Sequence, residues 1–360
     1  MKRIYLLIIL ITIWSCKQIG DYSIQIIKID TQKSDSVSLS NIVSYVDKII
    51  LEANDSSLIT RINEIETTNE YIFINDAGNR ILQFDYSGMF VKQIGKQGRG
   101  PGEYNTIYNI ASDSITKILF IDTYKKILCF DFSGRLLTVI KQESMPEFIT
   151  VVGNKLWSIS TTFAHELGNE RYVNITRLIR YDFQGNSVDT LIVKNVYLDS
   201  QAGTTNPKSF FVSDLGRLQY IYYPVMLPEP LLRDTIYEIK ENKLIPSVKL
   251  DFGEAAKIKN GKKQVHIGNV FKTTRYLFVE YNYNKIPILF CYDYLDDVKY
   301  YAKQGFFDDF FLTGNIQLRP LDLKTEKLYF FLDSFELIGK IEGISEISNP
   351  VLFLVTLKNN

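Results

Sequence analysis

A nine-residue pattern that occurs three times decides how this chain folds: Arg80-Ile81-Leu82-Gln83-Phe84-Asp85-Tyr86-Ser87-Gly88, then KILCFDFSG at residues 126–134 and RLIRYDFQG at residues 177–185. Each copy is a short apolar strand that runs into an aromatic residue, Asp, an aromatic residue, a variable residue and Gly. The Asp side chain can accept a hydrogen bond from the backbone ahead of it, and Gly tolerates the positive φ of a tight turn. The pattern therefore predicts the same β-hairpin at three places.

The repeat continues through the rest of the chain. Weaker copies lie at residues 236–239 and 289–293, and successive copies are 46, 51, 58 and 53 residues apart. Each copy follows another apolar segment, and residues 327–332 supply a sixth such segment. A period near 50 residues, with four short strands per unit, is typical of a β-propeller, and residues 37–360 give 54 residues per blade for six blades. We therefore expect an all-β, six-bladed β-propeller of four-stranded antiparallel blades. An N-terminal strand at residues 46–52 should close it beside residues 350–355.

The N-terminus has the pattern of an export signal. Met1-Lys2-Arg3 is basic, and residues 4–13 are apolar except for Thr12. This run is too short to cross about 30 Å of hydrocarbon as a helix. Cys16 follows it and resembles the lipidated cysteine of a bacterial lipobox, although Trp14 stands where a smaller residue is usual. An ordinary cleaved signal with an incidental Cys16 is the alternative.

These observations divide the chain into three parts. We expect a lipoprotein-type signal peptide at residues 1–16, a polar tether at residues 17–36 and the propeller at residues 37–360. Such a protein would be exported and lipid-anchored to the outer membrane, and it could face the periplasm or the exterior.

The loop at residues 94–104 (IGKQGRGPGEY) indicates which kind of propeller repeat this is. Four glycines and a proline give it a shaped backbone that is neither helix nor strand. Together with Asp76-Ala77-Gly78-Asn79-Arg80-Ile81 and the first hairpin, it completes the elements D-x-x-N-R-I, F-D-x-x-G and G-x-x-G-x-G-P-G-x-aromatic. This combination resembles one NHL-type propeller repeat. With the lipobox, the chain is similar to largely uncharacterised six-bladed propeller lipoproteins of Gram-negative gut bacteria.

One face of the expected propeller is the candidate binding surface. In a four-stranded blade, the turn between the second and third strands lies on the same face as the crossing to the next blade. The long irregular stretches at residues 95–104, 163–174, 195–209, 224–234 and 253–264 all map to this face. Loops on one side of a rigid scaffold usually carry function. The candidate binding residues are Arg80, Lys96, Arg99, Tyr104, His165, Glu166, Arg171, Tyr172, Glu229 and Arg233. A solvated surface is the alternative.

Composition argues against several kinds of chemistry. The 41 basic and 41 acidic residues balance, so a nucleic-acid partner is not expected. His165 and His266 are the only histidines, too few for the histidine metal site that the NHL-type lyases would imply. Cys129 and Cys291 lie in apolar segments, so we expect both to be core residues. The glycine loop lacks the G-K-[ST] of a phosphate-binding loop. We expect no catalytic residue and no cofactor; calcium is conceivable, but no motif supports it.

Two classes of function remain, beside a purely structural role in an envelope complex. The first is a membrane-tethered, non-catalytic binding module for a protein, peptide or glycan. The second is a propeller hydrolase or lyase with a metal held by carboxylates in the central channel.

Overall fold

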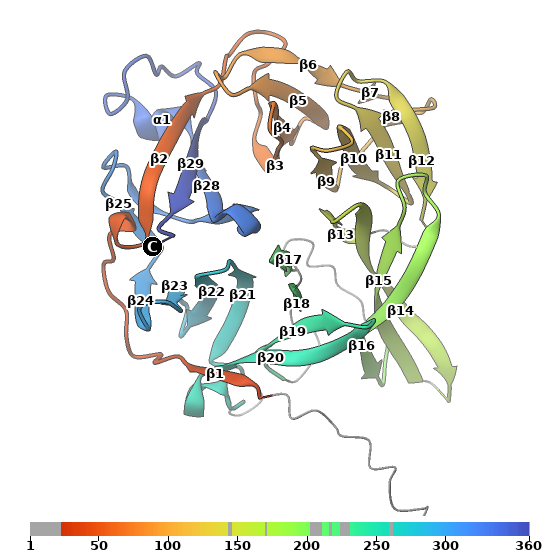
Figure 1. The fold of residues 1–360 in the computed structure, drawn as a ribbon, viewed down its shortest axis with the longest axis vertical. Coiled ribbons are helices and arrows are strands. Elements are labelled where there is room, and N and C mark those ends of the chain that lie inside the picture. The colour runs from red at the N-terminus through yellow and green to blue at the C-terminus, as the bar shows by residue number, and fades with distance from the viewer. Residues whose placement is uncertain are drawn as a thin grey trace, which may run out of the picture.

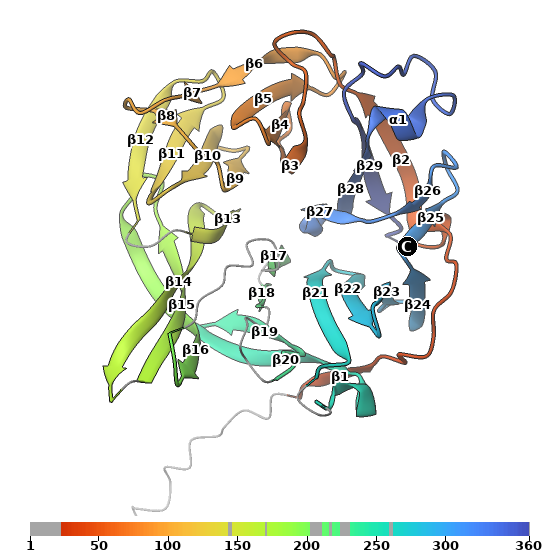
Figure 2. The ribbon, with the colours of Figure 1, turned by 180° about the vertical axis from the view of Figure 1, so that it is seen from behind.

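The computed structural model describes residues 23–142, 146–169, 171–201, 211–215, 218–223, 231–258 and 262–359. Six sheets of four antiparallel strands stand around one axis (Figure 1), and the view from behind shows the same closed ring (Figure 2). The expected six-bladed β-propeller is confirmed. We number the blades from one to six along the chain.

Blades one to five take their four strands in chain order, and blade six takes its outermost strand from the N-terminal part of the chain. The strands of each blade follow here from the innermost to the outermost. Blade one has β3 (Ile62–Thr67), β4 (Tyr71–Asp76), β5 (Arg80–Asp85) and β6 (Phe90–Ile94); blade two has β9 (Asn109–Asp113), β10 (Ile118–Thr123), β11 (Lys126–Asp131) and β12 (Leu136–Lys141). Blade three has β13 (Pro146–Val152), β14 (Lys155–Gly168), β15 (Arg171–Tyr181) and β16 (Ser187–Leu198); blade four has β17 (Phe211–Leu215), β18 (Leu218–Tyr222), β19 (Thr235–Lys240) and β20 (Lys243–Asp251). Blade five has β21 (Val265–Lys272), β22 (Tyr276–Tyr283), β23 (Ile286–Asp293) and β24 (Val298–Lys303); blade six has β27 (Arg319–Asp322), β28 (Lys327–Leu332), β29 (Val351–Leu357) and β2 (Val43–Ile50).

The ring closes as the sequence predicts. Strand β2, from the N-terminal part of the chain, is the outermost strand of blade six and pairs antiparallel with β29. Val46 lies opposite Val355, and Ile50 lies opposite Val351. Because the two strands come from opposite ends of the chain, their pairing ties the first and last parts of the propeller together.

Part of the expected polar tether belongs to the fold, so that prediction is wrong for residues 25–36. Strand β1 (Gln25–Lys28) adds a fifth strand to blade four, parallel to β20. Ile27 and Ile29 are buried, and Asp35 then forms a bridge with Ala302 of blade five. Two buried isoleucines within a mostly polar sequence therefore help to fix this segment along the outer edges of blades four and five.

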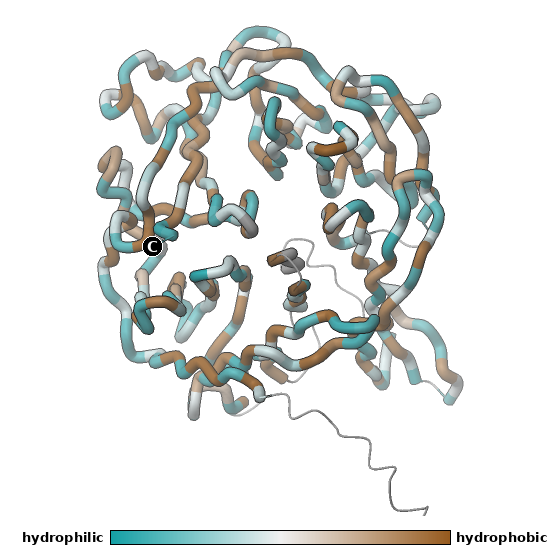
Figure 3. Tube along the Cα trace, in the orientation of Figure 1, coloured by the Kyte–Doolittle hydropathy of each residue, from teal (hydrophilic) through white to brown (hydrophobic). Residues whose placement is uncertain are grey.

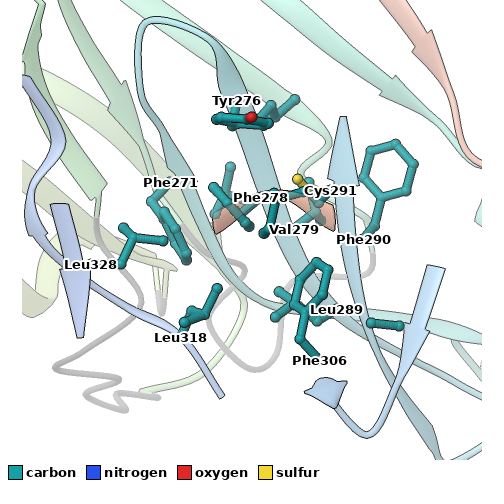
Figure 4. Close-up of a cluster of buried hydrophobic side chains, with 14 of the residues drawn as sticks. Phe271, Tyr276, Phe278, Val279, Leu289, Phe290, Cys291, Phe306, Leu318 and Leu328 are labelled. Carbon is teal, nitrogen blue, oxygen red and sulfur yellow. The ribbon is translucent and has the colours of Figure 1, made fainter. Parts of the chain in front are cut away.

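The blades pack through aromatic side chains at one repeated position. The second strand of every blade carries a buried aromatic residue that pairs with the third strand at the same step of the repeat: Phe73, Phe120, Trp157, Tyr220, Phe278 and Tyr329. Cys129 and Cys291 lie opposite two of these residues, and both thiols are buried and unpaired with each other, as predicted. Figure 4 shows the largest core cluster around Phe278 and Cys291, and Figure 3 shows hydrophobic segments in every blade.

The two faces of the propeller differ. On one face, which we name the tight-turn face, two to five residues join the first and second strands of every blade. Connections of the same length join the third and outermost strands of blades one to five; in blade six these two strands come from opposite ends of the chain. The opposite face, the loop face, carries the crossings between blades and six short inserted elements. The inserted elements are β7 (Lys96–Gln97), β8 (Glu103–Tyr104), η2 (Gly253–Ala256), β25 (Phe306–Asp308), β26 (Gly314–Ile316) and α1 (Ser334–Leu337). Two further short helices are η1 (Leu39–Asn41), before β2, and η3 (Leu323–Thr325), in a tight turn.

Candidate functional site

The glycine loop between blades one and two wraps around one of its own carboxylates. Strands β7 and β8 pair in parallel, and Glu103 Oε2 accepts a hydrogen bond from the Gly100 N–H at 2.7 Å. Lys96 Nζ lies 3.1 Å from Glu103 Oε1. The Gly100 N–H and then the Lys96 ammonium hold the pKa of Glu103 below its usual value. Since Glu103 already occupies the position that an external anion would take, the loop serves as a blade crossing.

Tyr104 lies in the core rather than on the candidate surface. Its side chain is buried, and its hydroxyl donates a hydrogen bond to the Ile94 carbonyl at 2.6 Å. Burial raises the pKa of Tyr104 to about 12. The residue therefore fixes the glycine loop against blade one and is out of reach of a surface ligand.

Arg80 is held by structural contacts on the loop face. Its guanidinium donates to Asp76 Oδ2 at 2.6 and 3.0 Å and to the Leu58 carbonyl at 2.6 Å. The fully buried Asp76 also accepts hydrogen bonds from the N–H groups of Thr60 and Arg61. The D-x-x-N-R-I element thus joins the turn of blade one to the crossing that enters it. Arg99, by contrast, is exposed.

The candidate residues near position 170 lie together on an extension of blade three, not on an irregular loop. Strands β14, β15 and β16 continue beyond the blade and remain paired, as the lower right of Figure 1 shows. His165 lies opposite Val173, and Glu166 lies opposite Tyr172, while Arg171 begins β15 at the tip. Because neighbouring positions of a strand point to opposite sides, His165 and Glu166 lie on different faces of the extension.

A bulge marks the start of the extension. Ala164 has a φ of 50°, and its N–H donates to the Oδ1 of the buried Asn174 at 2.8 Å. The register between β14 and β15 shifts at this place. Bulges of this kind bend and twist a strand pair, so Asn174 helps to set the direction in which the extension leaves the blade.

Two cations share one aromatic ring at the foot of the extension. The Arg233 guanidinium lies 5.0 Å and the Lys194 Nζ 5.7 Å from the ring centre of Tyr223, and Tyr237 stacks on the same tyrosine at 5.4 Å. Lys194 belongs to blade three and the tyrosines to blade four, so this cluster joins the two blades. Of the sequence candidates that the structure describes, Arg233 is the one in this cluster.

A row of polar side chains crosses blade three beside this cluster. The hydroxyls of Thr161 and Thr176 lie 2.9 Å apart, and Thr176 is paired with Lys194. Glu147 is almost fully buried, and neither of its carboxylate oxygens has a hydrogen-bond partner in the described structure. Burial raises the pKa of Glu147, against the opposing effects of Thr161 and Lys194. Cations, hydroxyls and a carboxylate at one blade junction can recognise polar groups.

The carboxylates on the innermost strand of blade one cap backbone groups instead of gathering around a metal. Glu64 accepts the Ile110 N–H at 2.9 Å, and Glu66 accepts the N–H and hydroxyl of Ser112, each at 2.9 Å. Burial raises the pKa of Glu66 to about 8. Among the described residues, no three His, Cys, Asp or Glu side chains are close enough to hold a metal ion.

Four of the sequence candidates, His165, Glu166, Arg171 and Tyr172, lie together on the blade-three extension. Arg80, Lys96 and Arg99 belong to blade one and to the crossing that follows it. Glu229 and Cys16 lie outside the described residues. Lys194 was missed, although a lone lysine within the apolar strand LIVKNV was a usable signal.

Comparisons with known proteins agree with the fold. Residues 23–356 match the family described as "Domain of unknown function (DUF4934)". The chain belongs to this family. No curated protein matches it. A crystal structure of a Bacteroides fragilis protein, described as a candidate exported protein, is similar at 19% identity with a TM-score of 0.68, and the match covers 93% of this chain and 100% of the other.

Two weaker similarities carry no argument about function. BamB from Moraxella catarrhalis shares 13% identity at a TM-score of 0.42, with 78% of this chain and 72% of the other covered. A protein of unknown function from Bacteroides caccae shares 13% identity at a TM-score of 0.40, with 72% of this chain and 82% of the other covered. At these identities, even the stronger similarity to the Bacteroides fragilis protein shows the fold alone.

Proposed function

We propose that this propeller is an exported, lipid-anchored binding module without catalytic activity, and that its loop face binds a partner in the cell envelope. Of the candidate partners (protein, peptide or glycan), an extended polypeptide is favoured. The observation that carries the proposal is the blade-three extension, a long strand edge that projects from a rigid propeller.

The edge of β16 is suited to strand addition. It is a 12-residue strand at the outer edge of its described sheet, and such an edge presents backbone groups to which a further strand can pair. One of its carbonyls, that of Thr190, accepts a hydrogen bond from Asn242 Nδ2 at 3.4 Å. Val188, Ile192 and Tyr197 are exposed along it. Blade four already accepts such an additional strand, because β1 pairs in parallel with its outermost strand. A partner peptide could occupy the corresponding edge of blade three.

The direction of β1 supports a role for the loop face. Strand β1 runs parallel to β20, which ends at the loop face, so the chain enters β1 from the side of the tight turns. If Cys16 is lipidated, the eight residues 17–24 can reach at most about 28 Å from the membrane. This arrangement would hold the tight-turn side toward the bilayer and leave the loop face free for a partner. None of the helices in the described residues is long and apolar enough to cross a membrane.

Site-specific photo-crosslinking in whole cells tests the proposal. A photoreactive amino acid replaces Tyr197 on the extension or, as the matched control, Ile115 in a tight turn; both native side chains are exposed, at 71% and 88%. We expect a discrete protein adduct from position 197 and none from position 115. Adducts from position 115 alone, or no adduct at position 197, would reject the extension as the binding surface.

A further inference from the structure

A second surface with a distinct chemistry lies on blade six. The connection between β28 and β29 covers residues 333–350 and contains α1, and the hairpin of β25 and β26 lies beside it. Lys340 Nζ in the first segment donates to the Thr313 carbonyl in the second at 3.4 Å. These two segments therefore form one continuous part of the loop face, at the left of Figure 1.

Large apolar side chains are exposed on both segments. Phe335, Ile347 and Leu312 are 71%, 80% and 68% exposed. Ile338 and Phe310 are exposed as well, and we name these five residues the blade-six patch. Other apolar residues of the same connection, Leu337 and Ile341, are buried in the core and hold it in place. The segment thus buries one set of apolar side chains and leaves another set in solvent, which is typical of an interaction surface.

The connection is also fixed at its far end. Asn349 Oδ1 accepts the Ile59 N–H at 2.7 Å, and Asn349 Nδ2 donates to the carbonyls of Glu52 and Ser57 at 2.8 and 2.9 Å. Asn349 is itself buried. The patch therefore lies on an ordered segment, so the loss of conformational entropy when a partner binds is smaller than it would be for a disordered segment.

Charges around the patch restrict what can cover it. The connection carries four exposed acidic residues and one basic residue: Asp333, Glu336, Glu342, Glu346 and Lys340. A membrane surface with anionic lipids would be repelled by such a rim. A symmetric contact between two copies would bring the same acidic rims together, which is also unfavourable. A partner with apolar side chains flanked by Lys or Arg could bury the apolar side chains of the patch and pair with the acidic residues around it.

We propose that the blade-six patch is a docking site for a basic, apolar peptide segment of another protein. The inference shares only the loop face with the proposed function. It uses no residue of the blade-three extension, so either proposal can fail while the other stands.

Selection of peptides from a displayed random library, with the full-length protein as bait, tests this assignment. We expect selected peptides to combine apolar residues with Lys or Arg. Their dissociation constants, measured by fluorescence anisotropy, should rise about tenfold for the double variant Leu312→Ser/Phe335→Ser. The charge variant Glu342→Lys/Glu346→Lys should produce a similar loss without removing any apolar contact. Ile115→Ser, at an even more exposed apolar position on the tight-turn face, is the control and should leave binding unchanged.

Every other outcome overturns the assignment. No enrichment of peptides, or enriched peptides without basic residues, excludes the proposed chemistry. Equal binding by the wild type and both double variants places the peptide elsewhere. Self-association in sedimentation, or binding to anionic vesicles, that the same variants abolish would assign the patch to a second copy or to a membrane.

Discussion

Asp122 should make the stability of the propeller depend on pH. This carboxyl is fully buried; Asn109 Nδ2 donates to its Oδ2 at 2.8 Å, while Oδ1 has no hydrogen-bond partner in the described structure. Burial raises the pKa of Asp122 from 3.8 to about 8. The folded protein therefore binds this proton more tightly than the unfolded chain does. The contribution to stability is greatest below pH 4 and declines as the pH rises toward 8.

The size of the effect follows from the shift. Between pH 4 and pH 8, this one group should lower the free energy of unfolding by about 1.4 kcal/mol per pH unit. The loss at pH 7, relative to pH 3, is then about 4 kcal/mol. Asp122→Asn cannot ionise but can still accept the hydrogen bond from Asn109. We expect the variant to lose that slope and to be more stable than the wild type at pH 7.

The repeat supplies a reciprocal control. Asn75 in blade one holds the place of Asp122 in blade two: each lies opposite the first aliphatic residue of its repeat, Ile81 or Ile127. Asn75 is 1% exposed. Asn75→Asp should therefore add a pH slope of the same sign to the one the protein already has. Urea unfolding at pH values from 4 to 8 measures both variants. A slope unchanged by Asp122→Asn would refute the reasoning, because Asp122 would then ionise normally in the folded state.

Five further changes test other parts of the structure. Gly102 has a φ of 76°, so Gly102→Val should lower the free energy of unfolding in urea by about 1–3 kcal/mol. Arg99 is exposed, so Arg99→Ala should change that free energy by no more than about 0.5 kcal/mol. A large loss of stability in the arginine variant would show that Arg99 has a structural role. Tyr104→Phe leaves a buried carbonyl without its donor and should cost about 1–3 kcal/mol by the same assay; no loss would mean that water replaces the hydroxyl. Deleting residues 37–52 removes the closing strand and should lower the melting temperature of the whole domain, and an unchanged melt would contradict closure by β2. Cys16→Ala should release the protein from the membrane fraction or block its maturation, and an unchanged fraction would argue against lipidation.

The architecture could be predicted because residues close together in the sequence specify each strand and turn of the repeat. Asp85 and Gly88 specify a turn within a few residues, and the same pair returns as Asp131 and Gly134. Asp85 Oδ1 accepts the Ser87 and Met89 N–H groups, so the expected Asp-backbone contact is present. Ring closure also followed from the sequence, since one strand had to lie outside the six consecutive units. These inferences needed periodicity and turn chemistry alone.

The candidate site could be predicted only in part, because its contacts are between blades. Tyr104 looked like a surface aromatic at the end of a glycine loop, yet the loop folds back and buries it against Ile94. Residues 163–174 looked irregular because a bulge at Ala164 breaks the period-two pattern that marks a strand. The meeting of Lys194 with Tyr223 depends on how blade three packs on blade four. A pattern along one strand does not contain that information.

The distribution of insertions across the ring bears on how binding could work. The extension of blade three and the patch on blade six belong to blades that are not neighbours in the ring. The propeller itself separates the two surfaces. Substitutions that are far apart and share no partner are expected to act independently. The two surfaces could therefore bind two segments of one partner, and the gain would come from effective concentration and not from any new contact. A partner that uses both surfaces should lose affinity in two separable steps, one at Tyr197 and one at Phe335, whereas a partner of only one surface should respond to only one of these changes.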